Sequence, residues 1–97
     1  MGSLIDGLNK AFESRVRLGI MSVLTVNETI DFNTLKELLD VTDGNLASHL
    51  KALEKEEMIT MKKKFIGRKP NTTYSITEFG LDAFNAHINA LEKLLNN

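Results

Sequence analysis

The sequence predicts a mainly helical α+β domain in which two short helices, joined by a tight turn, precede a two-stranded hairpin. Three observations support this prediction. Apolar residues recur at helical spacing over most of the chain, this spacing changes to alternation only over residues 59–76, and polar caps interrupt the helical pattern near residues 33 and 42. With 97 residues and one proline, the chain is expected to form a single domain over residues 1–97.

The N-terminal part of the chain predicts a short terminal helix over about residues 3–12, followed by a longer helix that Ser14 caps. The longer helix is expected to end near Thr25. Its apolar residues surround most of its surface, which favours a central, buried position. A short β-prone stretch follows at residues 29–32.

A helix–turn–helix is predicted over about residues 33–57. Asn33 is expected to cap its first helix and Thr42 its second. Because the second cap leaves only a residue or two between the helices, their axes cannot be collinear. The leucines that predict the buried stripe of the second helix are Leu46, Leu50 and Leu53.

The alternating segment predicts a β-hairpin over about residues 59–76, closed by a five-residue basic loop from Gly67 to Asn71. Thr77 then caps a terminal helix over about residues 78–95, in which apolar residues recur as a heptad-like seam. A helix–turn–helix followed by a two-stranded β wing is the winged-helix fold. The two terminal helices, one at each end of the chain, are expected to serve dimerisation.

Charge is distributed unevenly along the chain. The net charge is −1, yet the segment from Thr60 to Ile76 holds five basic residues and no acidic residue. A local excess of this kind favours a polyanionic partner, whereas the mean charge does not. The alternative is a hairpin whose lysines only keep its edge strands soluble.

The composition excludes several classes of site. The chain has no cysteine and two histidines, so thiolate metal sites and histidine-rich metal sites are not expected, nor is any cofactor. No spacing brings a nucleophile and a base together, so the protein is not expected to be an enzyme. No apolar run approaches the roughly 20 residues that cross a bilayer, so a cytoplasmic protein without a membrane partner is expected. His49 is expected to pack partly buried beside its helix neighbours, and His87 to pack at the surface or in an interface.

Three stretches carry a family resemblance: Val16 to Met21, Thr42 to Glu54, and Gly67 to Pro70 together with Tyr74 to Gly80. The sequence resembles the small stand-alone winged-helix transcriptional regulators of the MarR and ArsR groups over nearly its whole length. The resemblance implies a DNA-binding homodimer joined through its terminal helices. The cysteine-containing sites of many ArsR-like metal sensors have no counterpart in this chain.

The polar arc of the second helix of the helix–turn–helix predicts contacts with duplex DNA. Its N-terminal part is expected to read base edges in the major groove, while lysines further along reach phosphates. The alternative is an exposed helix that only avoids apolar residues. The expected base contacts are Gly44, Asn45 and Ser48. The expected phosphate contacts are Lys51 and Lys55 on this helix and Lys62, Lys64 and Lys69 on the wing, where Arg68 is expected to enter the minor groove.

The terminal helices predict a dimer interface, although they could instead cover each other within one chain. The predicted function is that of a sequence-specific duplex-DNA-binding transcriptional regulator acting as a homodimer. The alternative is a winged-helix protein–protein interaction module that does not bind DNA. The sequence does not indicate a small-molecule effector. The residues expected in the dimer interface are Leu4, Leu8, Leu81, Phe84, Ile88, Leu91 and Leu95.

Overall fold

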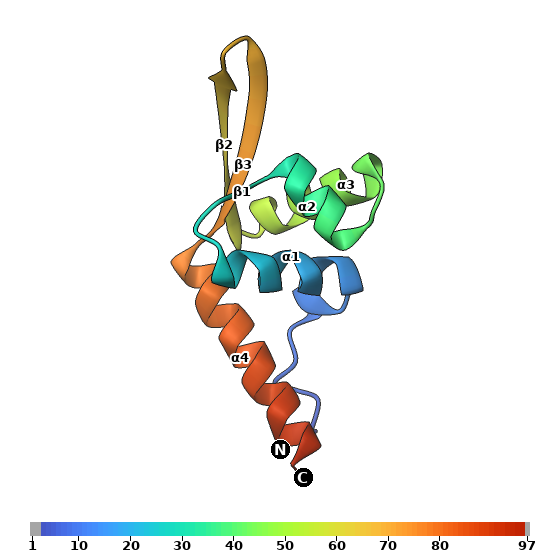
Figure 1. Cartoon of the computed structure of the whole chain (residues 1–97). Coiled ribbons are helices and arrows are strands. Elements are labelled where there is room, and N and C mark those ends of the chain that lie inside the picture. Colours follow the sequence, from blue (N-terminus) through green and yellow to red (C-terminus); the bar gives the residue numbers. More distant parts are fainter. Residues whose placement is uncertain (1–2, 97) are drawn as a thin grey trace.

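The computed structural model describes residues 3–96 and shows a winged-helix fold, as predicted (Figure 1). Four α-helices, a 3-10 helix and three strands make up this part of the chain. In chain order they are η1 (Lys10–Phe12), α1 (Arg15–Val26), β1 (Ile30–Asp31), α2 (Phe32–Leu39), α3 (Asp43–Lys55), β2 (Ile59–Ile66), β3 (Lys69–Ile76) and α4 (Glu78–Leu95).

A side-chain cap begins each α-helix, and three of the predicted caps are confirmed. In these three, a hydroxyl accepts a backbone N–H two or three residues ahead. The cap of α2 is Asp31 and not Asn33, because the Asp31 carboxylate accepts both the backbone N–H and the hydroxyl of Thr34. The confirmed caps are Ser14 for α1, Thr42 for α3 and Thr77 for α4.

The three strands form one antiparallel sheet in the order β1-β3-β2. The hairpin of β2 and β3 lies within the predicted range, but its loop is shorter than predicted. Only Gly67 and Arg68 separate the strands, because Gly67 adopts a left-handed φ of 66° that closes a two-residue turn. Pro70 therefore lies in β3, opposite Phe65 and beyond the rungs that pair β3 with β1.

The prediction of a terminal helix over about residues 3–12 is wrong. Residues 4–7 form turns, and only the three residues of η1 are helical before α1. Long-range contacts fix this segment against α4: the Asn9 N–H donates to Nδ1 of His87 over 2.9 Å, and a Cβ added to Gly7 would lie 3.1 Å from that of Ala90. His87 is thus buried within its own chain, which corrects the expectation of a surface or interface position.

The core surrounds α1, as its apolar sequence predicts. Ile20, Met21 and Leu24 are buried against side chains from α2, α3 and the base of the sheet. Below them the ring of Phe12 meets Phe84 edge-on, with 5.4 Å between the ring centroids. These contacts fix the positions of α3 and the wing on one body.

The molecule is elongated because two elements project from this body. Its Cα radius of gyration is 14.7 Å and its principal extents are 55 × 25 × 21 Å, whereas a compact chain of this length has a radius of about 12 to 13 Å. The hairpin rises at one end, and the C-terminal half of α4 extends at the other beside the N-terminal segment (Figure 1). No helix among residues 3–96 is long and apolar enough to cross a membrane.

Candidate nucleic-acid interface

Helix α3 presents a buried stripe to the core and a polar arc to solvent. Its three predicted core leucines are fully buried, which fixes the rotation of the helix. The hydroxyl of Thr42 accepts the Asn45 N–H over 3.2 Å and holds the first turn. The side chains on the opposite arc are exposed, as base and phosphate contacts require: Gly44, Asn45, Ser48, Lys51 and Lys55.

Gly44 has no packing reason to be glycine. A Cβ added there would meet no atom within 4 Å, and the residue is helical. Glycine in a helix costs about 0.5–1 kcal/mol relative to alanine. No packing contact in the described structure therefore requires a glycine at this position.

The N-terminal turn of α3 also holds an acid, Asp43, which would repel phosphates if it were alone. Nζ of Lys36 on α2 lies 2.7 Å from its carboxylate; the Lys36 side chain is 40% exposed and that of Asp43 is 71% exposed. The pair contributes little to stability, about 0–1 kcal/mol. Its effect on the surface is to neutralise the acid beside the predicted base contacts.

The wing exposes every side chain from Lys62 to Pro70. All four predicted wing contacts lie in this segment, with Arg68 in the turn itself. Lys63 has the same exposure but lies on the opposite face from Lys62 and Lys64, so the sequence-based prediction omitted one cation. The wing is thus a basic, acid-free projection from the same body that carries α3 (Figure 1).

Arg17 is a further residue that sequence reasoning missed. It lies in the first turn of α1, and its Nε–H donates to Nδ1 of His49 on α3 over 3.0 Å. His49 is partly buried, as expected. Burial, and secondarily the charge of Arg17, lowers the pKa of His49 below its ordinary value. No local signal could have paired residues 32 positions apart.

The predicted dimer surface is only partly available to a partner. Phe84 is 5% exposed and packs in the core of its own chain, so it does not belong to this surface. Ile88 also packs against that core. By contrast, Leu95 is 85% and Leu4 65% exposed. Leu81 is exposed, while Leu8 and Leu91 are half-buried.

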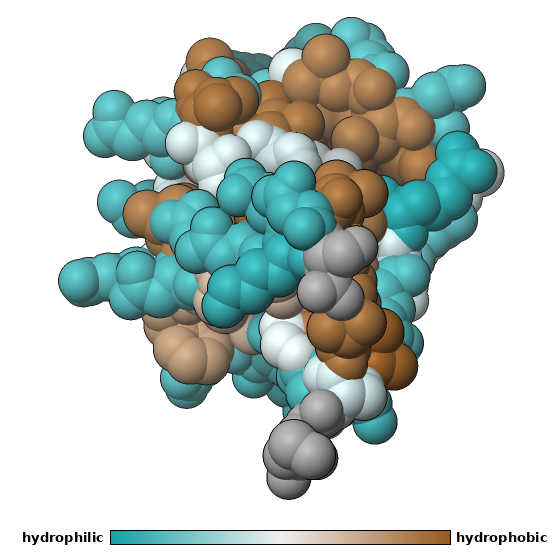
Figure 2. Space-filling model, turned by 90° about the horizontal axis from the view of Figure 1, so that it is seen from below, coloured by the Kyte–Doolittle hydropathy of each residue, from teal (hydrophilic) through white to brown (hydrophobic). Residues whose placement is uncertain are grey.

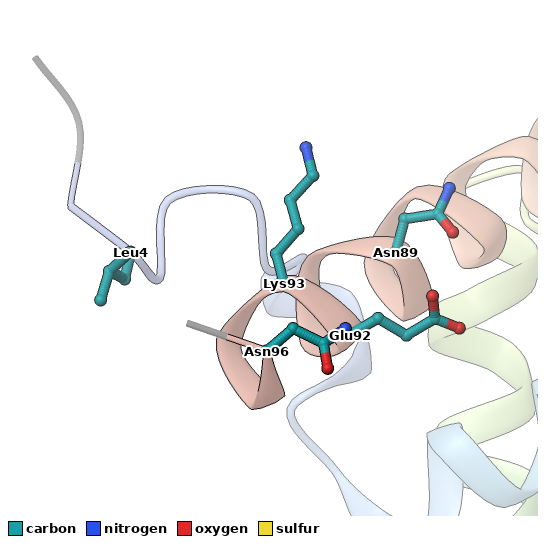
Figure 3. Close-up of a pocket in the computed structure, with 5 residues that line it drawn as sticks. All are labelled: Leu4, Asn89, Glu92, Lys93 and Asn96. Atoms are coloured by element: carbon teal, nitrogen blue, oxygen red, sulfur yellow. The ribbon is translucent and has the colours of Figure 1, made fainter.

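Apolar and polar groups alternate at the end of the molecule opposite the wing. Apolar patches lie between hydrophilic side chains on this end (Figure 2). A shallow pocket there is lined by Leu4, by Asn89, Glu92 and Lys93 of α4, and by Asn96, the C-cap of that helix (Figure 3). Within residues 3–96, no cluster of three or more His, Cys, Asp or Glu could hold a metal ion.

Comparison with known proteins decides the family. Residues 16–95 match the winged helix DNA-binding domain family, which covers both the helix–turn–helix and the wing. The chain belongs to this family. A relative, the uncharacterized protein MJ0432 of Methanocaldococcus jannaschii, is 41% identical over 88 residues, which cover 91% of this chain and 96% of the relative.

Solved structures of regulators share the fold of this winged-helix domain. A transcriptional regulator homologue from Pyrococcus horikoshii OT3 is 29% identical with a TM-score of 0.77, over 90% of this chain and 91% of that protein. The zinc-responsive MarR family member ZitR of Lactococcus lactis is 19% identical with a TM-score of 0.69, over 99% and 63% of the two chains. An ArsR family regulator, RHA00566, has a TM-score of 0.61 at 17% identity, over 100% and 98%.

The predicted resemblance to MarR- and ArsR-like regulators is therefore confirmed. The family and the regulators that share its fold support a DNA-binding regulator as the broad function of this winged-helix domain.

Proposed function

We propose that this winged-helix domain is a sequence-specific transcriptional regulator that binds duplex DNA as a homodimer. The observation that carries the proposal is the combination of two surfaces on one rigid body. The polar arc of α3 offers groups that read base edges, and the acid-free wing offers five cations for the phosphate backbone.

Sequence specificity rests on the arc of α3. Asn45 can donate to and accept from an adenine edge at once, and the Ser48 hydroxyl can do either. Gly44 lets the first turn of the helix come close to the duplex. Lys51 and Lys55, one and two turns further along, have the reach and charge to bind phosphates and so fix the register of the helix in the groove.

Dimerisation rests on the end of the molecule opposite the wing. The C-terminal half of α4 projects beyond the body with its terminal leucine exposed, and the N-terminal segment exposes Leu4 and Ile5 beside it. These side chains have no cover within residues 3–96, and a two-fold partner would bury them. A two-fold dimer would also present two α3 helices to successive major grooves of a palindromic site.

The experiment that tests the proposal is selection of bound fragments from a library of genomic DNA by the purified protein. The expected result is a small set of fragments that share a two-fold symmetric sequence. Recovery of fragments without a shared sequence would reject sequence specificity. Failure to retain any duplex at low salt would favour the protein–protein interaction module, which would have to use the same exposed arc and wing.

A further inference from the structure

The tip of the wing exposes two large apolar side chains in the most basic segment of the protein. Phe65 is 73% and Ile66 is 63% exposed. Neither belongs to the core or to the apolar residues packed against it. Five cations and no acid lie between Lys62 and Lys69 around them. Together with Pro70 these two side chains form an exposed apolar patch inside a basic segment, and patches of this kind are typical of interaction sites.

The hairpin register concentrates these apolar groups at its last two rungs. Phe65 lies opposite Pro70, and Ile66 lies opposite Lys69, directly before the Gly67–Arg68 turn. Strand alternation places Phe65 and Pro70 on the same face of the hairpin as the buried Ile59 and Tyr74. The tip therefore has an apolar pair on the face that continues from the core and an isoleucine on the other face.

The length of the wing carries this tip well away from the body. Eight paired residues per strand span about 26 Å at roughly 3.3 Å per residue. Only the base of the hairpin, where Ile59 and Tyr74 are buried, packs against the helices, and the tip stands free (Figure 1). A narrow two-stranded end with apolar side chains is a shape that can enter a groove.

We propose that the wing tip is a wedge that inserts Phe65, with Pro70 opposite it on the same face of the hairpin, at a base step in the minor groove of duplex DNA and bends the duplex. Phe, Ile and Pro are among the side chains that part base steps in this way. The surrounding lysines bind the flanking phosphates and offset the cost of unstacking, while Arg68 in the turn enters the same minor groove. A site with a flexible pyrimidine–purine step under the wing is therefore preferred. This inference rests on the proposed DNA binding.

Charge complementarity favours DNA over a protein as the partner into which this tip inserts. An apolar groove on a protein could bury Phe65, but it would also have to accommodate five cations within eight residues. A minor groove supplies phosphates along both walls and stacked bases between them, so it satisfies the cations and the apolar groups together.

The test uses the full chain and one duplex recovered in the fragment selection. The duplex carries a donor and an acceptor dye at its ends to report bending. A matched series replaces one adenine at a time with 2-aminopurine, whose fluorescence rises when its base is unstacked. For the wild type we expect closer duplex ends and a fluorescence rise confined to one step in each half-site.

The Phe65→Ala variant separates the wedge from the electrostatic contacts. We expect it to lose the bend and the 2-aminopurine signal and to bind about 5- to 100-fold more weakly, as is typical when one aromatic side chain that stacks on a base is removed. Its salt dependence should stay at the wild-type slope, because no charge is removed.

Lys64→Ala should do the reverse: it should lower the salt slope and keep the 2-aminopurine signal. Phe79→Ala, which removes an exposed phenylalanine on α4, is the matched control.

Each other outcome is decisive. A wild type that binds and bends this duplex no differently from Phe65→Ala overturns the wedge and leaves the proposed function standing. A Phe65→Ala variant that binds DNA normally but changes its sedimentation identifies the tip as a contact between protein chains. If the wild type retains no duplex at all, the proposed function fails first, and the wedge with it.

Discussion

Arg17 on α1 donates its Nε–H to Nδ1 of His49 on α3, over a distance of 3.0 Å. Nδ1 accepts only in the neutral imidazole, where the proton resides on Nε2. The hydrogen bond therefore joins the first turn of the central helix to the helix predicted to read DNA, and it holds while His49 is uncharged. Burial is the larger cause, and the Arg17 charge the smaller, of the lowered pKa of His49.

The first prediction is that acid weakens the fold through His49. In the unfolded chain His49 titrates near its ordinary value of 6.5, and in the folded chain below it. The unfolded state thus binds more protons between the two values, so stability is complete above the unfolded value and falls as the pH drops through this window. Urea unfolding midpoints between about pH 7.5 and pH 5 should show this decrease.

The matched control is His49→Gln, whose amide oxygen can still accept from Arg17 but cannot take up a proton. Its unfolding midpoint should change less with pH than that of the wild type over the same range. Equal pH dependence in the two proteins would show that other groups carry the acid sensitivity and that His49 contributes none.

A second prediction concerns the arc of α3. Asn45→Ala or Ser48→Ala should weaken binding to a selected duplex by roughly 1–3 kcal/mol, because each removes a group that reads a base edge. Binding to a random duplex should hardly change, since phosphate contacts remain. Fluorescence anisotropy with both duplexes makes the comparison. If the variants keep the wild-type preference for the selected duplex over the random one, these two residues do not read base edges.

The third prediction separates the wing from the arc. Replacing Arg68 and Lys69 together by alanine should weaken binding to selected and random duplexes alike and lower the salt slope by about 1 for each phosphate that the variant no longer binds. Lys10→Ala, which removes a cation from η1, is the control and should keep the wild-type slope. If the double variant binds every duplex as the wild type does, these wing residues are solvated and nothing more.

Fourth, Gly44→Ala should move stability and affinity in opposite directions. The added methyl group meets no neighbour, so the helix should gain up to about 1 kcal/mol. The same methyl group should weaken binding to duplex DNA if the backbone lies close to it. Ala47→Gly, at an exposed position of the same helix, should lose stability and keep its affinity. An unchanged affinity in Gly44→Ala would place the first turn of α3 away from the duplex.

The local parts of the fold could be predicted from the sequence. Caps such as Thr42 and the leucine stripe of α3 act over three to seven residues, so their geometry follows from spacing alone. The N-terminal segment was predicted wrongly, because its apolar spacing is helical and only contacts with α4 prevent the helix. The hydrogen bond between Asn9 and His87 spans 78 positions, and no sequence pattern near Asn9 predicts it.

The candidate site shows the same division. The exposure of Asn45 and Ser48 follows from the rotation of α3, which its buried leucines fix. The wing loop was predicted too long, because Gly67, Pro70 and Asn71 all favour turns and no local feature shows which residues between them pair. Arg17 was missed because its partner lies on another helix, and the contact exists only once α1 and α3 are packed together.

The last prediction is that the dimer depends on the end of α4. Leu95 is largely exposed and makes no core contact, so Leu95→Glu should leave the fold of the protomer intact while placing a charge in the proposed interface. Burying an unpaired carboxylate is costly, so the dimer should dissociate. Ile88 is a poorer choice because it packs against the core of its own chain, and its replacement would confound folding with assembly.

Leu38→Glu is the control: Leu38 is 61% exposed, but it lies on α2, away from α4. Sedimentation equilibrium at tens of micromolar, near the weak end of specific association, should give a dimer for the wild type and Leu38→Glu and a monomer for Leu95→Glu. A wild-type monomer under these conditions would reject the proposed dimer.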